Sequence, residues 1–373
     1  MTTIRDVAAE SGFGVGTVSR ALNGDLGVRP ETRELVLGAA QKLGYRRNGL
    51  ARALRQRTSR TVGLMVPDLQ NEFFMAGAQV AQDRLAEAGF GLIVGCHKDD
   101  RLVDTAILES LVDRHVDALL HAPCGNPATT EVLRSNPGLV VVEFGRSSGR
   151  DDVDSVTGDD AAGAVAIVDH LAGLGHKRIA LVTGPPALST SAARLAGFRA
   201  GLRASGLHRR DCPIYQGPYT PAAAEDAAAQ LLKEHPDVTA IFAASSRGAS
   251  GVLRALRKLG ISVPGGMSLA GFLNADWYDL VQPGLTCYRV PVAGMGTAAV
   301  SLLLGRIGGS DIGPPQHLVL RGELVVRQST APPREGPLQL GQSADGANDQ
   351  GDVGRDPRSA ETDAAALVTI ATA

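Results

Sequence analysis

TIRDVAAESGFGVGTVSRALN, residues 3–23, has the pattern of two short helices joined by a tight turn. Thr3 and Asp6 stand in a Thr-x-x-Asp arrangement that can cap the first helix. Two glycines within Gly12–Gly14 interrupt the apolar spacing and favour a turn. The helical spacing resumes over Val15–Leu22. The stretch therefore predicts a helical hairpin.

The second helix of this hairpin leaves short polar side chains and one arginine on its outer face. Hydroxyls of this kind hold phosphates, and an arginine can bridge O6 and N7 of guanine in the major groove. We expect Arg20 to read a base directly and Val15 to be able to contact a thymine methyl group. A small helical hairpin with a solvated face is the alternative interpretation. The DNA-contacting residues predicted in this stretch are Thr3, Val15, Gly16, Thr17, Ser19, Arg20 and Asn23.

The charge distribution separates the N-terminal end from the rest of the chain. A third helix is expected to begin near Pro30 and to end at Gly44. Residues 1–60 contain eleven Arg and Lys against five Asp and Glu, a net charge of +6, whereas the whole chain carries −2. A basic end on an acidic body is typical of a nucleic-acid-binding protein with a separate second function.

Length and composition indicate a soluble protein of two or three units. The chain has 373 residues, of which 44% are hydrophobic and 20% charged. No basic-then-apolar leader and no apolar run of about 18 residues is apparent, so export and membrane insertion are not expected. The four cysteines form no CxxC pair, which fits a reducing cytoplasm. They are Cys96, Cys124, Cys212 and Cys287.

From Thr61 onward, short apolar strands alternate with helices. This alternation predicts parallel sheets covered by helices on both faces. It starts afresh near Asp159, so we expect two Rossmann-like, doubly wound α/β lobes behind the all-α headpiece. Strands expected in the first lobe are Thr61–Pro67, Phe90–Cys96, Ala118–His121 and Leu139–Glu143.

The loops that follow predicted strands are the candidate ligand-binding loops, because ligands of such sheets lie beyond the carboxyl ends of the strands. The guanidinium of Arg194 could hold two ligand oxygens, and an aromatic ring such as Trp277 or Tyr219 could supply a flat apolar face. The alternatives are a surface ion pair for Arg194 and core packing for the aromatic residues.

The sequence contains no catalytic constellation, and no enzyme activity or cofactor is expected. Neither a P-loop nor a complete GxGxxG motif follows a strand. His97, Asp99 and Asp100 could imitate a metal-binding cluster, but we interpret this segment as a solvated loop.

Several ordered segments resemble the lactose-repressor (LacI/GalR) family of bacterial transcription regulators. They are TIRDVAAESGFGVGTVSRALN, GYRRNGLARALR, RTVGLMVPDLQNEFF, LGHKRIALVTGPP, RLAGFRAGL and LVVRQSTAPP. The resemblance covers roughly residues 2–333 and implies a periplasmic-binding-protein-like core. It places a helix-turn-helix headpiece at 1–45, a hinge helix and linker at 46–60, and the core at 61–333. Lobe crossings are expected near 158, 289 and 320.

The resemblance also implies roles for individual residues. Arg194 matches the effector-binding arginine of the family, Phe73 and Phe74 match an aromatic pair that often lines the pocket, and Trp277 matches a common pocket aromatic. The hinge helix would fold on DNA and wedge a leucine into the minor groove. The further DNA-contacting residues predicted here are Tyr45, Asn48, Ala51 and Leu54. The predicted effector-binding residues are Phe73, Phe74, Arg194, Tyr219, Ser245, Leu273, Asn274 and Trp277.

The pocket departs from the family pattern at three places. Ser245-Ser246 replaces an Asn-Asp pair, Leu273-Asn274 replaces an Asp after Gly-Phe, and Glu72 replaces a Pro. Because the missing Asp would grip sugar hydroxyls, we hypothesise an effector whose acidic group faces Arg194 without an opposing carboxylate.

The DNA-binding end also departs from the pattern. Gly14 is a weaker helix cap than the usual small polar residue, Gly16 removes one base contact, and Arg47 replaces a Pro. We therefore keep an alternative in which the headpiece does not function and the chain is a sugar-binding protein.

The favoured prediction is a cytoplasmic, homodimeric regulator, usually a repressor in such families. It would bind a palindromic double-stranded DNA operator, and a small molecule would modulate that binding. Residues 334–373 are predicted to form a disordered tail without a leucine heptad, so dimerisation would use the core.

Overall fold

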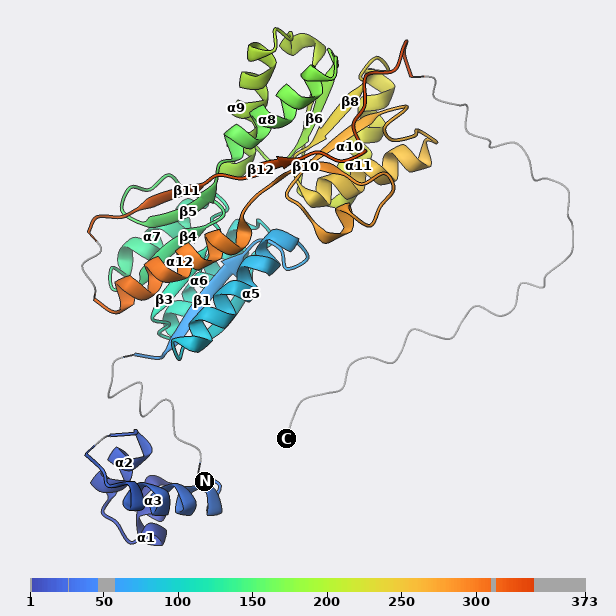
Figure 1. Cartoon of the computed structure of the whole chain (residues 1–373). Helices are drawn as coiled ribbons and strands as arrows, with labels where there is room; N and C mark the ends of the chain where they lie inside the picture. The colour runs from blue at the N-terminus through green and yellow to red at the C-terminus, as the bar shows by residue number, and fades with distance from the viewer. Residues whose placement is uncertain (1, 26, 46–57, 310–312, 339–373) are drawn as a thin grey trace, which may run out of the picture. The chain divides into compact units, whose positions relative to one another are not determined.

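The computed structural model describes residues 2–25, 27–45, 58–309 and 313–338. A headpiece of three helices lies at the N-terminal end, and a core of two α/β lobes follows from residue 58 (Figure 1). No helix among the described residues is long and apolar enough to cross a membrane.

The headpiece consists of α1 (Ile4–Ser11), α2 (Val15–Leu22) and α3 (Pro30–Lys42). Asp6 N donates to Thr3 Oγ1 at 3.4 Å and Thr3 N donates to Asp6 Oδ2 at 2.7 Å, which forms the predicted capping box. Gly12 then ends α1 with a φ of 73°, a conformation that favours glycine. The apolar faces of the three helices meet in a small core that contains Val7, Val18, Ala21, Leu22, Val28, Val36, Ala39 and Ala40.

The first lobe contains a six-stranded parallel sheet in the order β11-β5-β4-β3-β1-β2. Its strands are β1 (Thr61–Val66), β2 (Gly91–Cys96), β3 (Ala118–His121), β4 (Val140–Phe144), β5 (Asp154–Gly158) and β11 (His317–Leu320). Its helices are α5 (Glu72–Glu87), α6 (Arg101–Asp113), α7 (Pro127–Ser135) and α12 (Val292–Ile307). Strand β2 forms one edge of this sheet and β11 forms the other.

The second lobe contains a six-stranded sheet in the order β12-β10-β9-β8-β6-β7, in which only the β10–β12 pair is antiparallel. Its strands are β6 (Ile179–Thr183), β7 (Ile214–Gln216), β8 (Ala240–Ala243), β9 (Ser268–Phe272), β10 (Thr286–Arg289) and β12 (Glu323–Val325). Its helices are α8 (Asp160–Gly173), α9 (Ser189–Ala204), α10 (Pro221–Glu234) and α11 (Ser246–Lys258), with short 3-10 helices η1 (Arg209–Asp211) and η2 (Asp276–Tyr278).

Three segments of chain connect the lobes (Figure 1). The chain leaves the first sheet after Gly158 and returns to the first lobe between Arg289 and Val292. It leaves for the last time between Leu320 and Glu323. The two Rossmann-like lobes of the prediction are confirmed, with strands β5, β10, β11 and β12 as additions that the sequence did not reveal.

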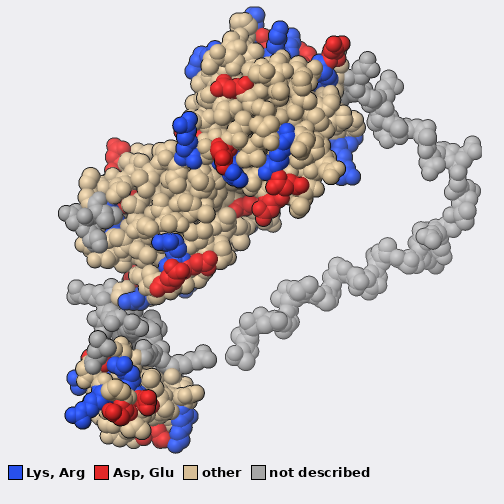
Figure 2. Space-filling view, in the orientation of Figure 1, with Lys and Arg blue, Asp and Glu red and all other residues tan. Residues whose placement is uncertain are grey.

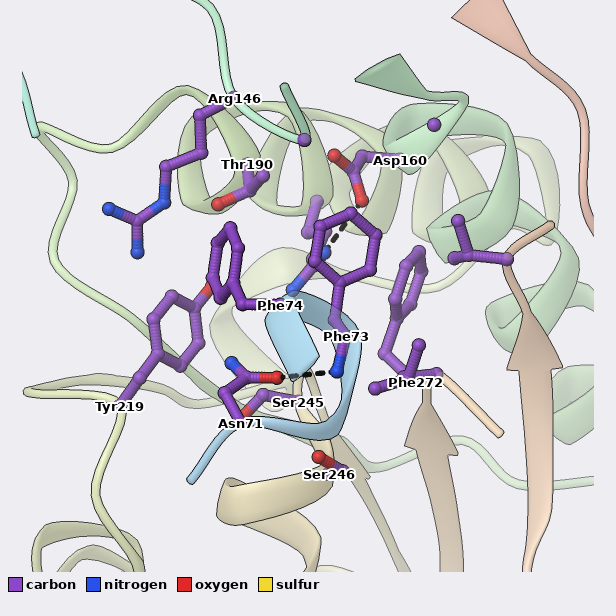
Figure 3. Close-up of a pocket in the computed structure, with 15 residues that line it drawn as sticks. Asn71, Phe73, Phe74, Arg146, Asp160, Thr190, Tyr219, Ser245, Ser246 and Phe272 are labelled. Carbon is purple, nitrogen blue, oxygen red and sulfur yellow. Dashed lines mark hydrogen bonds and ion pairs between the residues drawn. The ribbon is translucent and has the colours of Figure 1, made fainter. Parts of the chain in front are cut away.

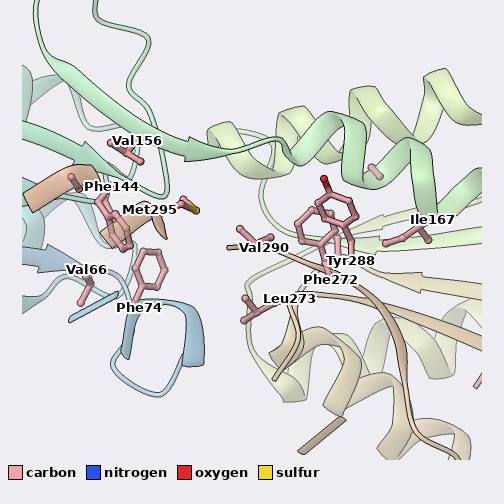
Figure 4. Close-up of a cluster of buried hydrophobic side chains, with 14 of the residues drawn as sticks. Val66, Phe74, Phe144, Val156, Ile167, Phe272, Leu273, Tyr288, Val290 and Met295 are labelled. Carbon is pink, nitrogen blue, oxygen red and sulfur yellow. The ribbon is translucent and has the colours of Figure 1, made fainter. Parts of the chain in front are cut away.

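The apolar core continues through both lobes (Figure 4). Phe74, Phe144 and Met295 belong to the first lobe's part, while Phe272 and Tyr288 belong to the second lobe's part. Helix packing in the second lobe depends on small residues. A Cβ at Gly197 in α9 would stand 2.2 Å from the carbonyl oxygen of Ala161 in α8, so only glycine allows this close approach.

The C-terminal end of the core extends further than predicted. The disordered tail was expected to begin at residue 334, but the Arg334 guanidinium donates to the carbonyl oxygens of Gly266, Pro236 and Val238 at 2.7–2.8 Å. These bonds fix Arg334 to the second lobe, and the described chain continues to Leu338. The remaining part of the predicted tail lies outside the described residues.

Candidate functional site: a DNA-reading helix and a pocket between two lobes

Helix α2 presents the predicted DNA-contacting residues on its solvent side. Val15, Gly16, Arg20 and Asn23 are exposed, whereas Thr17 and Ser19 are half-buried. Val18, Ala21 and Leu22 turn the opposite face into the headpiece core. One face of α2 is therefore available to a groove of DNA.

Two of the three departures noted at the DNA-binding end, Gly14 and Gly16, lie at the start of α2. Gly14 occupies the N-cap position with an extended backbone and supplies no side-chain hydrogen bond. Gly16 has open space where a Cβ would stand. Of the other predicted contacts, Thr3 is the cap of α1, and Tyr45 packs in part against the headpiece core. Asn48, Ala51 and Leu54 lie outside the described residues.

The positive charge of the N-terminal end is concentrated after the three helices. Residues 2–45 contain five basic and five acidic side chains, so the +6 of residues 1–60 comes from positions 46–60. Figure 2 accordingly shows both signs of charge on the headpiece. Most of the positive charge that could attract phosphate therefore lies in positions 46–60, whereas the predicted base contacts lie on α2.

A pocket lies between the two lobes, at the carboxyl ends of their strands (Figure 3). The space between its walls, open solvent included, amounts to about 550 Å³. Its lining combines aromatic faces with a few polar groups, as in many small-molecule sites. The lining residues are Asn71, Phe73, Phe74, Gly145, Arg146, Gly158, Asp160, Thr190, Arg194, Tyr219, Ser245, Ser246, Phe272, Leu273 and Val290.

Arg194 is fixed in this pocket by a buried ion pair with Asp160. Its Nε and Nη2 lie 2.9 Å and 2.8 Å from Asp160 Oδ1, and its Nη1 donates to the carbonyl oxygen of Ala244 at 2.6 Å. The guanidinium also stands 4.1 Å above the centre of the Phe272 ring. Only 14% of the Arg194 side chain and 8% of the Asp160 side chain are exposed.

Burial and the charge of the partner have opposite effects on the pKa values of Asp160 and Arg194. Burial raises the pKa of Asp160, and the charge of Arg194 opposes that rise. Burial alone would lower the pKa of Arg194, but the charges and hydrogen bonds of Asp160 and Tyr219 together outweigh burial, so the pKa of Arg194 is raised. The pair presents a preformed set of donors and acceptors with no net charge.

This geometry corrects the hypothesis of an arginine without an opposing carboxylate. Leu273 does replace the usual acid at the end of β9, but Asp160 on the first turn of α8 supplies a carboxylate to Arg194 from another direction. The sequence pattern could not reveal this, because Asp160 follows β5, a strand that was not predicted. The argument for an acidic effector therefore fails.

A second arginine, Arg146, lines the pocket and is also paired. Its Nη2 lies 3.2 Å from Asp99 Oδ2, its Nη1 bonds Asp99 Oδ1, and its guanidinium lies 5.7 Å from the centre of the Phe74 ring. Arg146 follows β4, a strand that was predicted, so the loop after that strand was the signal that could have found it.

The aromatic pair lies as the resemblance implies, at the start of α5. The rings of Phe73 and Phe74 meet edge to face at 5.0 Å, and Phe73 stacks on Phe144 at 5.4 Å. Asn71 caps α5 by accepting from Phe73 N at 3.1 Å, which fixes both rings at the pocket wall (Figure 3). Tyr219 approaches from the second lobe, and its hydroxyl accepts a hydrogen bond from Ser191 Oγ at 2.9 Å.

Six of the eight predicted effector-binding residues line the pocket, and two do not. Asn274 Oδ1 accepts from Arg327 Nη2 at 2.6 Å, outside the lining. Trp277 lies in η2 and packs edge to face on Tyr278, with ring centres 4.5 Å apart. Leu273 does line the pocket and has a φ of 74°, a strained value for a branched side chain.

Direct contacts join the lobes beside the pocket. Ser246 Oγ donates to Glu72 Oε2 at 2.7 Å, and Arg247 Nε lies 3.1 Å from Asp68 Oδ2. These bonds connect the N-terminal ends of α5 and α11. Glu72 and Ser246, two of the departures from the family pattern, are thus partners of each other.

Comparison with known proteins assigns the family. Residues 3–48 match the model of the bacterial regulatory proteins of the lacI family, and residues 168–330 match a periplasmic binding protein-like domain. The HTH-type transcriptional regulator MalR of Streptomyces coelicolor is 36% identical over 342 residues, which cover 88% of this chain and 97% of that protein.

Solved structures give the same assignment. The transcriptional regulator CelR in complex with cellobiose is 31% identical, with a TM-score of 0.66 over 88% of this chain and all of that chain. The Lac repressor dimer bound to operator is 24% identical with a TM-score of 0.79, over 88% of this chain and 99% of that one, which shows a shared fold. With its helix-turn-helix headpiece and its two-lobed core, this chain belongs to the LacI family and is a DNA-binding transcription regulator, not an enzyme.

Proposed function

We propose that the chain is a homodimeric, cytoplasmic regulator whose affinity for a palindromic operator is set by a neutral sugar or sugar-derived molecule bound between the lobes. The observation that carries this proposal is the pocket itself, because it lies between the lobes and combines aromatic faces with preformed polar groups.

The chemistry of the pocket favours a neutral polyol. Arg194 is paired with Asp160 and Arg146 is paired with Asp99, so neither guanidinium offers an uncompensated charge. An ion pair with free donor and acceptor sites suits hydroxyl groups, which both donate and accept hydrogen bonds. Phe73 and Phe272 can cover the apolar faces of a sugar ring. In the related CelR complex the bound molecule is cellobiose.

The coupling of effector to operator follows from linkage. An effector that contacts both lobes stabilises the arrangement in which those contacts form. If this arrangement alters the operator affinity of the dimer, the operator must alter the effector affinity by the same factor. The predicted hinge residues Asn48, Ala51 and Leu54 would carry this change to the DNA.

An apolar surface on the first lobe favours a second copy of the chain as partner. It is formed by Met75 on α5, Ile93 and Val94 on β2, and Leu102 and Val103 on α6, whose exposed fractions range from 38% to 83%. Strand β2 is also an edge of the sheet, and exposed apolar edges mark association sites.

The dimer can be tested by sedimentation velocity. We expect Val94→Lys to convert a dimer into a monomer, because it places a charge in the apolar surface. Val319→Lys is the matched control, since Val319 is 62% exposed on β11, the opposite edge of the same sheet. A monomeric wild-type chain, or equal loss of the dimer in both variants, would exclude this surface as the interface.

The effector class can be tested by calorimetric titration of the full chain with neutral mono- and disaccharides, including cellobiose. We expect saturable binding of at least one neutral sugar and its loss in Asp160→Asn. Asn274→Ala, outside the pocket, is the control and should bind normally. Binding of acidic sugars alone, or of none, would refute the proposed class.

A further inference from the structure

A buried cluster of metal-ligating side chains lies in the first lobe, separate from the effector pocket. It contains His97, directly after β2, His121 at the end of β3, and Asp104 on the first turn of α6. The three side chains are 0%, 3% and 0% exposed. None of them lines the pocket between the lobes. The fold thus brings together three side chains that are spread over 24 positions of the sequence.

We propose that His97, Asp104 and His121 form a binding site for a divalent transition metal, with Zn²⁺ as the best fit. Each side chain offers one ligand atom, and these atoms all lie within 4.8 Å of one another. Ligands around a tetrahedral zinc ion lie roughly 3.3–3.7 Å apart, given metal–ligand bonds of about 2.0–2.3 Å. Small side-chain rotations would close this difference.

The set of donor atoms selects among metals. Two imidazoles and one carboxylate suit zinc and neighbouring transition metals, whereas calcium and magnesium prefer sites built from oxygen atoms. Three protein ligands leave the fourth tetrahedral position of a zinc ion to water.

The contact between His121 and Asp104 shows where the metal would lie. His121 Nε2 lies 3.2 Å from Asp104 Oδ1. The two nitrogens of an imidazole ring point to opposite sides, so a metal bound by both residues would lie at Nε2 and replace this contact. The other ring nitrogen, Nδ1, is buried without a hydrogen-bond partner among the described residues and would carry the ring proton.

The surroundings of the cluster resemble the outer shell of a metal site. Thr129 Oγ1 and Asn126 Nδ2 both donate to Asp104 Oδ2, the latter at 3.1 Å. His97 Nε2 lies 3.1 Å from the carbonyl oxygen of Ala122. Outer contacts to carboxylates and to a ring N–H orient metal ligands in proteins. His97 Nδ1 accepts from Asp99 N at 3.2 Å, and a metal at Nδ1 would replace this one bond.

The first experiment measures metal content and affinity of the full chain with Zn²⁺ alone. After removal of metal by a chelator, we expect the wild-type chain to bind one Zn²⁺ per chain and to melt at a higher temperature with it. His121→Ala should lose this binding. His176→Gln should retain it, because His176 is equally buried but lies in the second lobe.

A further variant separates metal binding from a structural role. Thr129→Val keeps the shape of the side chain and removes one bond to Asp104, so we expect about 10–100-fold weaker Zn²⁺ binding.

Two outcomes would overturn the proposed metal site. A wild-type chain that binds no Zn²⁺, or that binds it equally well after His121→Ala, would show that the cluster is an ordinary hydrogen-bonded part of the core.

Discussion

The predicted reading surface of the headpiece and the pocket between the lobes are built in opposite ways. The predicted reading surface lies on one helix of eight residues, α2, and its side chains are exposed or half-buried. The pocket takes its residues from both lobes and holds them in buried pairs. We therefore expect substitutions of exposed residues on α2 to leave the fold intact, whereas loss of one member of a buried pair in the pocket should destabilise the core.

Two ion pairs show the same contrast. Lys42 and Glu10 in the headpiece have side chains that are 73% and 35% exposed, whereas those of Arg194 and Asp160 are 14% and 8% exposed. Water screens the first pair but not the second.

The largest effect is expected from Arg194→Ala. It would leave the Asp160 carboxylate buried without its partner and lower the free energy of unfolding by about 3–5 kcal/mol. Chemical denaturation of the full chain measures this loss, with Lys42→Ala as the exposed control that should leave the core transition unchanged. Equal stability of the two variants would contradict the contrast between pocket and headpiece.

Gly197→Ala should also destabilise the core strongly. Its Cβ would collide with the Ala161 carbonyl, so α8 and α9 must separate, at a cost of about 1–3 kcal/mol. Gly173→Ala is the matched control, because its Cβ would meet no atom within 4 Å. Thermal unfolding of both variants compares them, and a Gly197→Ala chain as stable as the control would show that the helices are not tightly packed.

Arg20→Ala should weaken operator binding without affecting the fold. Arg20 is exposed on α2, so its loss removes a base contact but no packing. We expect specific binding to fall by about 1–3 kcal/mol and base preference to flatten at one position. Fluorescence anisotropy with matched and mismatched duplexes measures both, and an unchanged preference would remove Arg20 from the reading surface.

Gly16→Ala should have the smallest effect, and a favourable one. Its Cβ would enter open space, and alanine favours a helix over glycine by about 0.5–1 kcal/mol. Slower amide hydrogen exchange in α2 of the full chain would reveal this gain. Faster exchange would indicate strain at the start of α2 that the open space does not explain.

The headpiece was predictable from sequence because its structure is local. The Thr3 cap, the break at Gly12 and the start at Pro30 each act within a few residues, and each lies where it was expected. The alternation of strands and helices likewise predicted the two lobes.

The pocket was predictable only in part, because its members are joined by the tertiary fold. Phe73, Phe74 and Arg194 lie in short segments that the family resemblance marks, and all three line the pocket. Asp160 follows β5, whose short polar sequence gives no strand signal, and so the partner of Arg194 was missed. Asn274 and Trp277 follow β9, but Asn274 bonds Arg327 and Trp277 lies in η2, so both are outside the lining.

The central claim, that this chain is an operator-reading dimer, is tested most directly by selecting duplexes from randomised DNA with the full chain at fixed salt. We predict enrichment of a palindrome with two half-sites, because two copies of α2 would read them with one symmetry. Binding that is sensitive to salt but enriches no sequence would contradict operator reading. Ligand binding in the pocket between the lobes would then be the main activity of the chain.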